Sequence, residues 1–197
     1  MIIGIDFDNT IADYTGVFYD VALKLDWIPE STGRSKTEVK SYFIISDNER
    51  KWTELQGIVY GKEIDQARPY TDCLQVLEQW HAKGHTLKLI SHKTRYPIIG
   101  EPVDFHHAAT NWLKSNGFIG SNGAPFSESD LNFNETKEEK LLCIDKLNCD
   151  LFIDDLESIF NHKLFPARCR KVLFNNNSNN KEGLTHITKW SDIPEVI

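Results

Sequence analysis

Two aspartates directly follow the first apolar segment of the chain. Ile2–Ile5 is a short run with three isoleucines, which is typical of a buried strand, and Asp6 and Asp8 come next, one residue apart. Carboxylates crowded at the end of a strand are costly unless a cation neutralises them or one of them stays protonated. The chain is therefore expected to begin with a strand that ends in a loop carrying chemically active groups.

Two later apolar segments also end in side chains suited to catalysis. The run 86–90 ends at Ser91, and the run 151–153 ends at the adjacent carboxylates Asp154 and Asp155. In an open parallel sheet, ligands bind outside the carboxyl ends of the strands. If these segments are parallel strands of one sheet, their polar ends converge with the first pair of aspartates.

A lysine-bearing helix is predicted between these two strands. Thr136 and Glu139 have the spacing of a capping box, which predicts a helix over 137–147. Lys137 and Lys140 lie in its first turns, and either could reach toward the strand ends.

Strands and helices alternate along most of the chain, which favours a parallel sheet with right-handed crossover connections. A helix is expected from Thr71 or Asp72 to Gly84, where the glycine suits a C-cap. The remaining expected elements are a helix over 104–116, a short strand at Phe133, a strand over 172–174 and a polar loop over 175–180. The predicted fold is α/β, with a Rossmann-like three-layer core around a parallel sheet.

The segment 13–68 interrupts this alternation. It is rich in aromatic residues and turn signals, and a connection of this length inside a compact domain needs structure of its own. We expect a mostly helical insert, with one helix over 15–25 and another within 47–59. The predicted domains are a core made of 1–12 and 69–197, and the insert 13–68.

The composition fits a soluble, cytoplasmic enzyme domain. A net charge of −7 argues against a general nucleic-acid binder, which needs a basic stripe. No apolar run approaches the roughly 18 residues needed to cross a bilayer, and no leader segment is visible, so no membrane association is expected. The four cysteines and seven histidines show no zinc-site spacing. Monomer and homodimer both stay open.

Taken in order, these segments resemble the four motifs of the haloacid dehalogenase-like (HAD) hydrolase superfamily, in its phosphatase branch with a small helical cap. The resemblance extends from residue 2 to about residue 175. The motifs correspond to residues 6–10, to Ser91, to a lysine within 137–140, and to Asp154 with Asp155. In this family the position of 13–68 is that of a cap covering the site.

The resemblance implies a phosphatase that hydrolyses a small phosphomonoester, of the nucleotide or sugar phosphate class, through an aspartyl-phosphate. Asp6 would be the nucleophile, and Asp8 would be the general acid and then the general base. Ser91 would bind the oxygens of the transferring phosphoryl group. Lys140 is preferred over Lys137 as the third-motif lysine, because its spacing to the fourth motif resembles that of relatives with an Asp-Asp pair.

The implied cofactor is Mg²⁺. It would be held by the Asp6 carboxylate, the backbone carbonyl of Asp8 and one carboxylate of the fourth motif, with waters completing the octahedron. Asp155 is preferred as the direct ligand, because the Gly-Asp form of this motif places its ligand at the second position. Asp154 would then act through a water or orient the lysine.

Three further residues are assigned to the substrate side of the site. Thr10 is expected to fix the first-motif loop by hydrogen bonding rather than by touching the substrate. His92 and Arg95 lie in an unusually polar stretch after Ser91, which either binds a second anionic group or is a solvated loop. The planar fork of Arg95 suits a phosphate or carboxylate.

Three other functions are alternatives to a phosphatase. The dehalogenase branch uses the nucleophile without a second aspartate, so the presence of Asp8 disfavours it. A phosphotransferase or phosphomutase of the same fold would share every motif named here. A non-catalytic phosphometabolite-binding protein is the remaining alternative, although it would be expected to lack one of the motif carboxylates.

Overall fold

The computed structural model describes residues 1–175 and 183–196. The chain divides into two compact units. The first contains Met1–Ala12, Pro69–Lys93 and Leu113–Ile197, and the second contains Asp13–Arg68 and Thr94–Trp112. The two-stranded sheet of β2 (Ala12–Asp13) and β3 (Arg68–Pro69) lies where the chain first enters the second unit and first leaves it.

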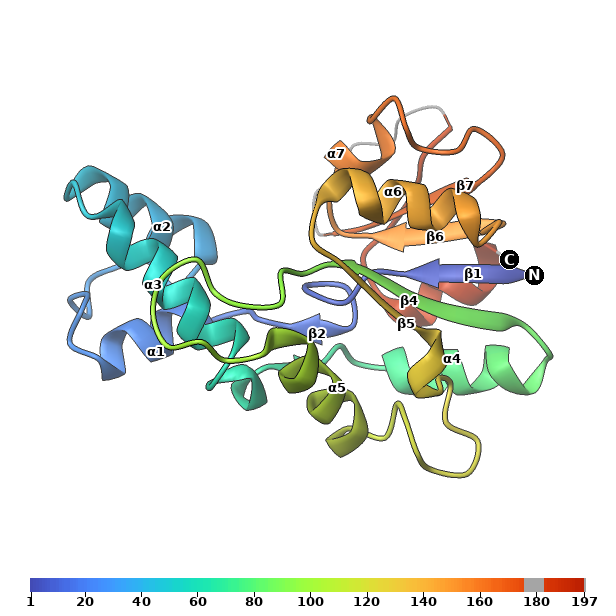
Figure 1. The fold of residues 1–197 in the computed structure, drawn as a ribbon, viewed down its shortest axis with the longest axis horizontal. Coiled ribbons are helices and arrows are strands. Elements are labelled where there is room, and N and C mark those ends of the chain that lie inside the picture. Colours follow the sequence, from blue (N-terminus) through green and yellow to red (C-terminus); the bar gives the residue numbers. More distant parts are fainter. Residues whose placement is uncertain (176–182, 197) are drawn as a thin grey trace. The chain divides into compact units, whose positions relative to one another are not determined.

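The first unit is built on a six-stranded parallel sheet, in which β1 lies between β4 and β6 (Figure 1). Its strands, in spatial order, are β5 (Leu131–Asn134), β4 (Thr86–His92), β1 (Ile2–Ile5), β6 (Leu151–Asp154), β7 (Arg170–Phe174) and β8 (Thr185–Ile187). The chain builds one half of the sheet before the other, so the strand order reverses beside β1. Open α/β sheets bind ligands at such a point. The predicted α/β fold with a parallel sheet is confirmed.

Helical segments cover both faces of this sheet. They are α4 (Cys73–Ala82), α6 (Lys137–Lys146), α7 (Glu157–Phe160), η2 (Glu128–Asp130) and η3 (Trp190–Val196). On one face, α6 packs in a buried cluster with Ile90 and Phe152. On the other, Trp80 of α4 lies 6.3 Å from the ring of Trp190, which lies 5.8 Å from that of Phe174. These contacts produce the three layers expected from the sequence.

Gly4 allows a close approach in the middle of the sheet. A Cβ atom added at Gly4 would lie 2.6 Å from Cδ2 of Phe152, which is closer than any real side-chain contact. The ring of Phe152 therefore covers β1 only because residue 4 has no side chain. The two strands that lead to Asp6 and Asp154 are packed together at this point.

The second unit is mostly helical. It contains α1 (Val17–Lys24), α2 (Lys36–Ile45), α3 (Glu49–Tyr60), η1 (Ile64–Gln66) and most of α5 (Phe105–Ser115). Helices were expected at the positions of α1 and α3, but α2 was not anticipated. Its N-terminus is a complete capping box, in which Ser35 and Glu38 bond each other's backbone amides.

Residues 94–112 belong to the second unit, although the sequence pattern assigns them to the core. Contacts with the insert explain this difference. The indole N–H of Trp112 donates to the carbonyl of Ala67 at 3.0 Å, and the rings of Phe105 and Tyr60 lie 6.5 Å apart. The side chains of α5 thus complete the hydrophobic interior of the helical unit.

Two remaining expectations concern loops and membrane spans. The polar loop predicted over 175–180 lies, apart from Asn175, outside the described residues. Among the helices of residues 1–175 and 183–196, none combines the length and the apolar character required to traverse a bilayer.

Candidate active site

The carboxyl ends of three neighbouring strands carry the polar residues singled out from the sequence. Asp6 follows β1, Ser91 lies near the end of β4, and Asp154 ends β6. Ile5 and Ile153 are partners in the ladder, and the amide of Asp6 donates to the Ile153 carbonyl at 2.9 Å. Asp6 and Asp154 therefore lie side by side on the same face of the sheet.

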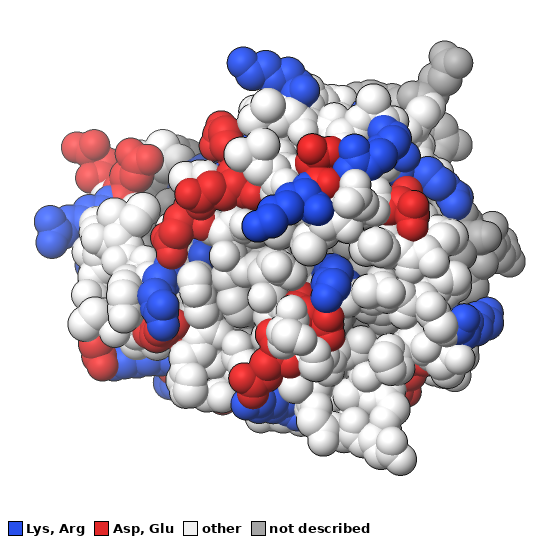
Figure 2. All heavy atoms as spheres, turned by 45° about the vertical axis from the view of Figure 1, so that its right-hand side comes forward, with Lys and Arg blue, Asp and Glu red and all other residues white. Residues whose placement is uncertain are grey.

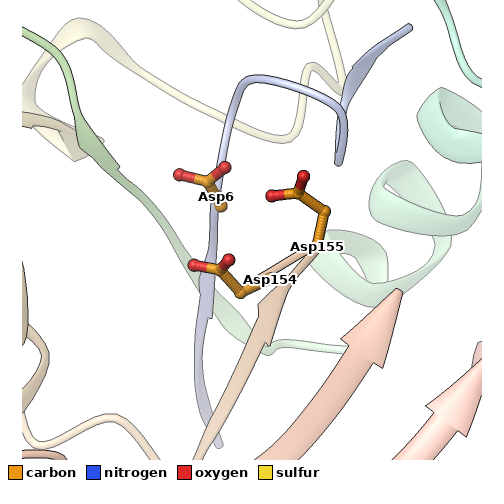
Figure 3. Close-up of side chains that lie close together, drawn as sticks. All are labelled: Asp6, Asp154 and Asp155. Atoms are coloured by element: carbon orange, nitrogen blue, oxygen red, sulfur yellow. The ribbon is translucent and has the colours of Figure 1, made fainter. Parts of the chain in front are cut away.

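Three carboxylates form a compact group at this edge (Figure 3). One oxygen from each of Asp6, Asp154 and Asp155 lies within 4.8 Å of the others. Asp6 and Asp154 are buried and Asp155 is partly exposed. Hard carboxylate oxygens at this spacing are the donor set that Mg²⁺ or Ca²⁺ prefers. These three residues could hold a divalent cation.

Lys140 joins two of the carboxylates. Its Nζ lies 2.7 Å from Oδ1 of Asp6 and 2.6 Å from Oδ2 of Asp154, and its side chain is buried. The predicted capping box at Thr136 is formed and begins α6, so that Lys140 lies one turn into the helix. Lys137 instead donates to the hydroxyl of Ser158 at 3.0 Å. The structure thus brings Lys140, rather than Lys137, to the carboxylates.

Burial and crowding control the charges of this group. Burial raises the pKa of Asp6 to about 7, and the nearby Asp154 and Asp8 also raise it, while Lys140 opposes the shift. Burial alone would lower the pKa of Lys140, but Asp154 and Asp6 outweigh it and the pKa is raised. A carboxyl group with a pKa near 7 is only partly ionised at neutral pH, so a bound cation would favour its ionised form.

Asp8 is paired with a second buried lysine. Nζ of Lys93 lies 2.8 Å from Oδ2 of Asp8 and 3.1 Å from Oδ1. The sequence reading treated the stretch after Ser91 only as an anion contact or a solvated loop, and it missed this pair. A signal was available, because residues two apart on an extended strand face the same side, and Lys93 is two residues beyond Ser91.

Ser91 and Thr10 carry buried hydroxyl groups at the strand ends. Neither Ser91 Oγ nor Thr10 Oγ1 has a hydrogen-bond partner within residues 1–175 and 183–196. Buried hydroxyl groups are rarely left unpaired in a native fold. Ser91 therefore has a donor to offer to a ligand. The backbone carbonyl of Thr10 accepts from the indole N–H of Trp190 at 2.9 Å, which attaches the first-motif loop to η3.

Asn9 allows the first-motif loop to turn tightly. Its φ of 58° lies in the left-handed region, which asparagine tolerates better than most residues. Its amide donates to the carbonyl of Ala12 at 2.8 Å, and the amides of Ile11 and Ala12 both donate to the carbonyl of Phe7 at 3.0 Å. This network holds the backbone between Asp8 and β2 in a closed turn.

The two remaining substrate-side candidates differ in position. His92 ends β4 and is exposed. Arg95 belongs to the second unit, where its Nε lies 2.9 Å from Oδ2 of Asp104. The hydrogen bond to Asp104 and the negative charge of this carboxylate raise the pKa of Arg95 above its ordinary value. The guanidinium is thus engaged by a carboxylate of its own unit.

Comparison with known proteins supports the fold assignment. No protein-family model matches the chain, and no curated protein matches it. Solved structures do match. A HAD hydrolase of family IA, variant 3, from Entamoeba histolytica has a TM-score of 0.61 at 11% identity, covering 98% of this chain and 94% of its own. A predicted phosphoglycolate phosphatase from Haemophilus somnus has a TM-score of 0.58 at 15% identity, with coverages of 99% and 96%.

A structure described as a dehalogenase has a TM-score of 0.58 at 11% identity, covering 100% of this chain and 96% of its own. Identities this low establish the fold alone. The chain has the fold of the HAD-superfamily hydrolases, as the order of its four motifs indicated.

Proposed function

We propose that this protein is a Mg²⁺-dependent phosphatase that hydrolyses a small phosphomonoester through an aspartyl-phosphate on Asp6. The observation that carries the proposal is the group formed by Asp6, Asp154 and Asp155, with Lys140 between the first two and Asp8 two residues beyond the nucleophile. The donors fit Mg²⁺, with the carboxylates of Asp6 and Asp155 as direct ligands, because all are hard oxygens and their negative charge exceeds that of Lys140. When bound, the ion would supply charge neutralisation between the nucleophile and the phosphoryl oxygens.

In the first half of the reaction, a carboxylate oxygen of Asp6 attacks phosphorus. The bond from phosphorus to the leaving oxygen breaks, and Asp8 gives that oxygen a proton. Lys140 directs two of its three N–H donors to carboxylates, which leaves one for a phosphoryl oxygen. The buried hydroxyl of Ser91 is a second donor for the charge that develops in the transition state.

In the second half, water attacks the phosphorus of the aspartyl-phosphate. Asp8, now ionised, takes a proton from that water, and the bond between phosphorus and the Asp6 oxygen breaks. The products are inorganic phosphate and the original carboxylate of Asp6. The same residue thus acts as acid and then as base, so the two half-reactions return the site to its starting state.

The proposed substrate class is a small phosphorylated metabolite, such as a nucleotide or a sugar phosphate. On the face shown in Figure 2, lysine and arginine side chains are interspersed with aspartate and glutamate. Together with a net charge of −7, this distribution supports a small ligand over an extended polyanion. The helical unit that contains 13–68 is proposed to be the cap that selects it.

Phosphate release from nucleotides, sugar phosphates and p-nitrophenyl phosphate, each with Mg²⁺ and with EDTA, tests the proposal. We expect release that needs Mg²⁺ and disappears in Asp6→Asn. A parallel series with alcohols and sugars as acceptors would identify a phosphotransferase, which forms a new ester instead of free phosphate. Binding of the same compounds without any turnover would indicate a binding protein and would refute the proposal.

A further inference from the structure

The site contains a buried lysine that the four motifs do not account for. The side chain of Lys93 is 3% exposed, whereas that of its partner Asp8 is 18% exposed. Both oxygens of Asp8 lie within hydrogen-bond distance of Nζ, at 2.8 and 3.1 Å. An ammonium group this deeply buried is costly unless a carboxylate accompanies it. Asp8 therefore determines where Lys93 can lie, and Lys93 in turn restricts the carboxylate of Asp8.

The backbone of Lys93 is held by the sheet. Its amide donates to the carbonyl of Asn134 at 2.8 Å, which extends the ladder between β4 and β5 by one residue. The ammonium also lies 5.4 Å from the centroid of the Phe7 ring, between the two aspartates of the first motif. A donor fixed by the sheet thus faces an acceptor on the turn that follows β1.

We propose that Lys93 is a positioning residue: it holds the carboxyl group of Asp8 in the orientation in which Asp8, once protonated, gives its proton to an alkyl leaving group. This inference rests on the proposed function and extends it to the substrate class. An alkoxide is a poor leaving group, so its departure depends on a well-placed proton donor. A nitrophenolate leaves readily without one. The pair of Asp8 and Lys93 therefore suits esters of aliphatic alcohols, such as sugar phosphates.

Two substrates with different leaving groups distinguish a positioning role of Lys93 from a purely structural role. Benzyl phosphate and p-nitrophenyl phosphate are similar in size but release an alcohol and a phenolate. For Lys93→Met, we expect kcat/KM for benzyl phosphate to fall by about 100-fold, since general acid catalysis contributes factors of that order. We expect kcat/KM for p-nitrophenyl phosphate to stay within about threefold, since that parameter reports only the steps up to departure of the leaving group.

Lys88→Met is the matched control. Lys88 lies on the same strand, and its Nζ pairs with Oδ1 of Asp130 at 2.6 Å, with side-chain exposures of 22% and 21%. The substitution Lys88→Met thus removes a partly buried lysine from β4 and leaves the ion pair of Asp8 unchanged. Both substrates should be affected alike, and only slightly. Losses of equal size on the two substrates in Lys93→Met, or no loss with benzyl phosphate, would overturn the proposal.

A double variant keeps the test decisive if Lys93→Met folds poorly. Asp8→Asn combined with Lys93→Met removes both members of the pair and leaves no buried charge without its partner. If Lys93 acts through Asp8, the double variant should match Asp8→Asn in kcat/KM for benzyl phosphate. A further tenfold loss would show an independent role and contradict the proposal. Parent protein that releases phosphate neither from these two esters nor from any nucleotide or sugar phosphate of the panel would refute the proposed function itself, whereas an active parent with equal losses refutes this inference alone.

Discussion

The ammonium of Lys140 lies 2.7 Å from the carboxylate of Asp6, although 134 positions separate the two residues in the sequence. The same ammonium contacts Asp154 at 2.6 Å, and all three side chains are buried. This arrangement links the start of α6 to the ends of β1 and β6. It also means that each charge in the group depends on the others for its stability.

Removing the shared lysine should therefore destabilise the protein. In Lys140→Met, Asp6 and Asp154 remain buried without their cation, and loss of one partner from a buried ion pair costs about 3–5 kcal/mol. We expect the free energy of unfolding, measured with urea at pH 7, to fall by about that amount. Lys137→Met is the control, because the side chain of Lys137 donates a hydrogen bond to the hydroxyl of Ser158 and pairs with no carboxylate among the described residues. Comparable losses in the two variants would contradict the ion-pair account.

The raised pKa of Asp6 predicts how stability depends on pH in the absence of metal. The group titrates at 3.8 when exposed and at about 7 in the fold, so between these values the native state holds a proton that the unfolded chain has released. Stability contributed by this group is therefore present below about pH 4 and lost as the pH rises to about 7. The raised pKa of Lys140 adds no slope in this window, since the lysine is protonated in both states.

Asp6→Asn isolates this contribution. The variant cannot ionise at residue 6, so its free energy of unfolding in EDTA should decline less than that of the parent between pH 4 and 7. Between pH 4 and 7, the total decline of the parent should exceed that of the variant by a few kcal/mol, on the order of the shift in pKa converted to free energy. Urea titrations at several pH values provide the measurement. Parallel curves for parent and variant would show that Asp6 does not titrate in this range.

The two carboxylates of the fourth motif should differ in their effect on Mg²⁺ affinity. Asp155 is partly exposed, whereas Asp154 is fully buried and bonded to both Lys140 and the amide of Leu156. We expect Asp155→Asn to weaken Mg²⁺ binding by at least about tenfold with little loss of stability, because it removes the proposed direct ligand. Asp154→Asn should mainly lower stability, because it exchanges an ionised partner of a buried lysine for a neutral one.

Calorimetric titration of each variant with MgCl₂, alongside urea unfolding, measures both quantities. The reverse pattern, with Asp154→Asn losing affinity and Asp155→Asn losing stability, would assign the direct ligand to Asp154.

The parallel sheet and the convergence of the motif residues at its edge could be predicted because the signals are local and periodic. A short apolar run ending in Asp6 predicts a strand end, and the spacing of Thr136 and Glu139 predicts a helix start. The partner of Asp8 could be predicted only in part, because alternation along an extended strand places Lys93 on the same side as Ser91 but does not identify the residue with which it pairs. Lys93 lies 85 positions away, and its pairing depends on how far β4 continues beyond Ser91.

The placement of 94–112 shows a second limit of local signals. The pattern of α5 predicts a helix, but not which hydrophobic interior that helix completes. Trp112 packs toward Ala67 and Phe105 toward Tyr60, and neither contact has a local sequence signature. The helix α2 is a different case, since its capping box at Ser35 was available in the sequence and was overlooked.

Trapping of the covalent intermediate tests the central claim most directly. Asp8→Asn retains the proposed nucleophile but lacks the proposed base that activates water, so phosphate transferred to Asp6 should persist. After incubation with p-nitrophenyl phosphate and Mg²⁺ and an acid quench, peptide mass spectrometry should locate one phosphoryl group on Asp6 and none in Asp6→Asn combined with Asp8→Asn. Full turnover by Asp8→Asn, or a phosphoryl group on another residue, would contradict the assignment of Asp6 as nucleophile and Asp8 as acid and base.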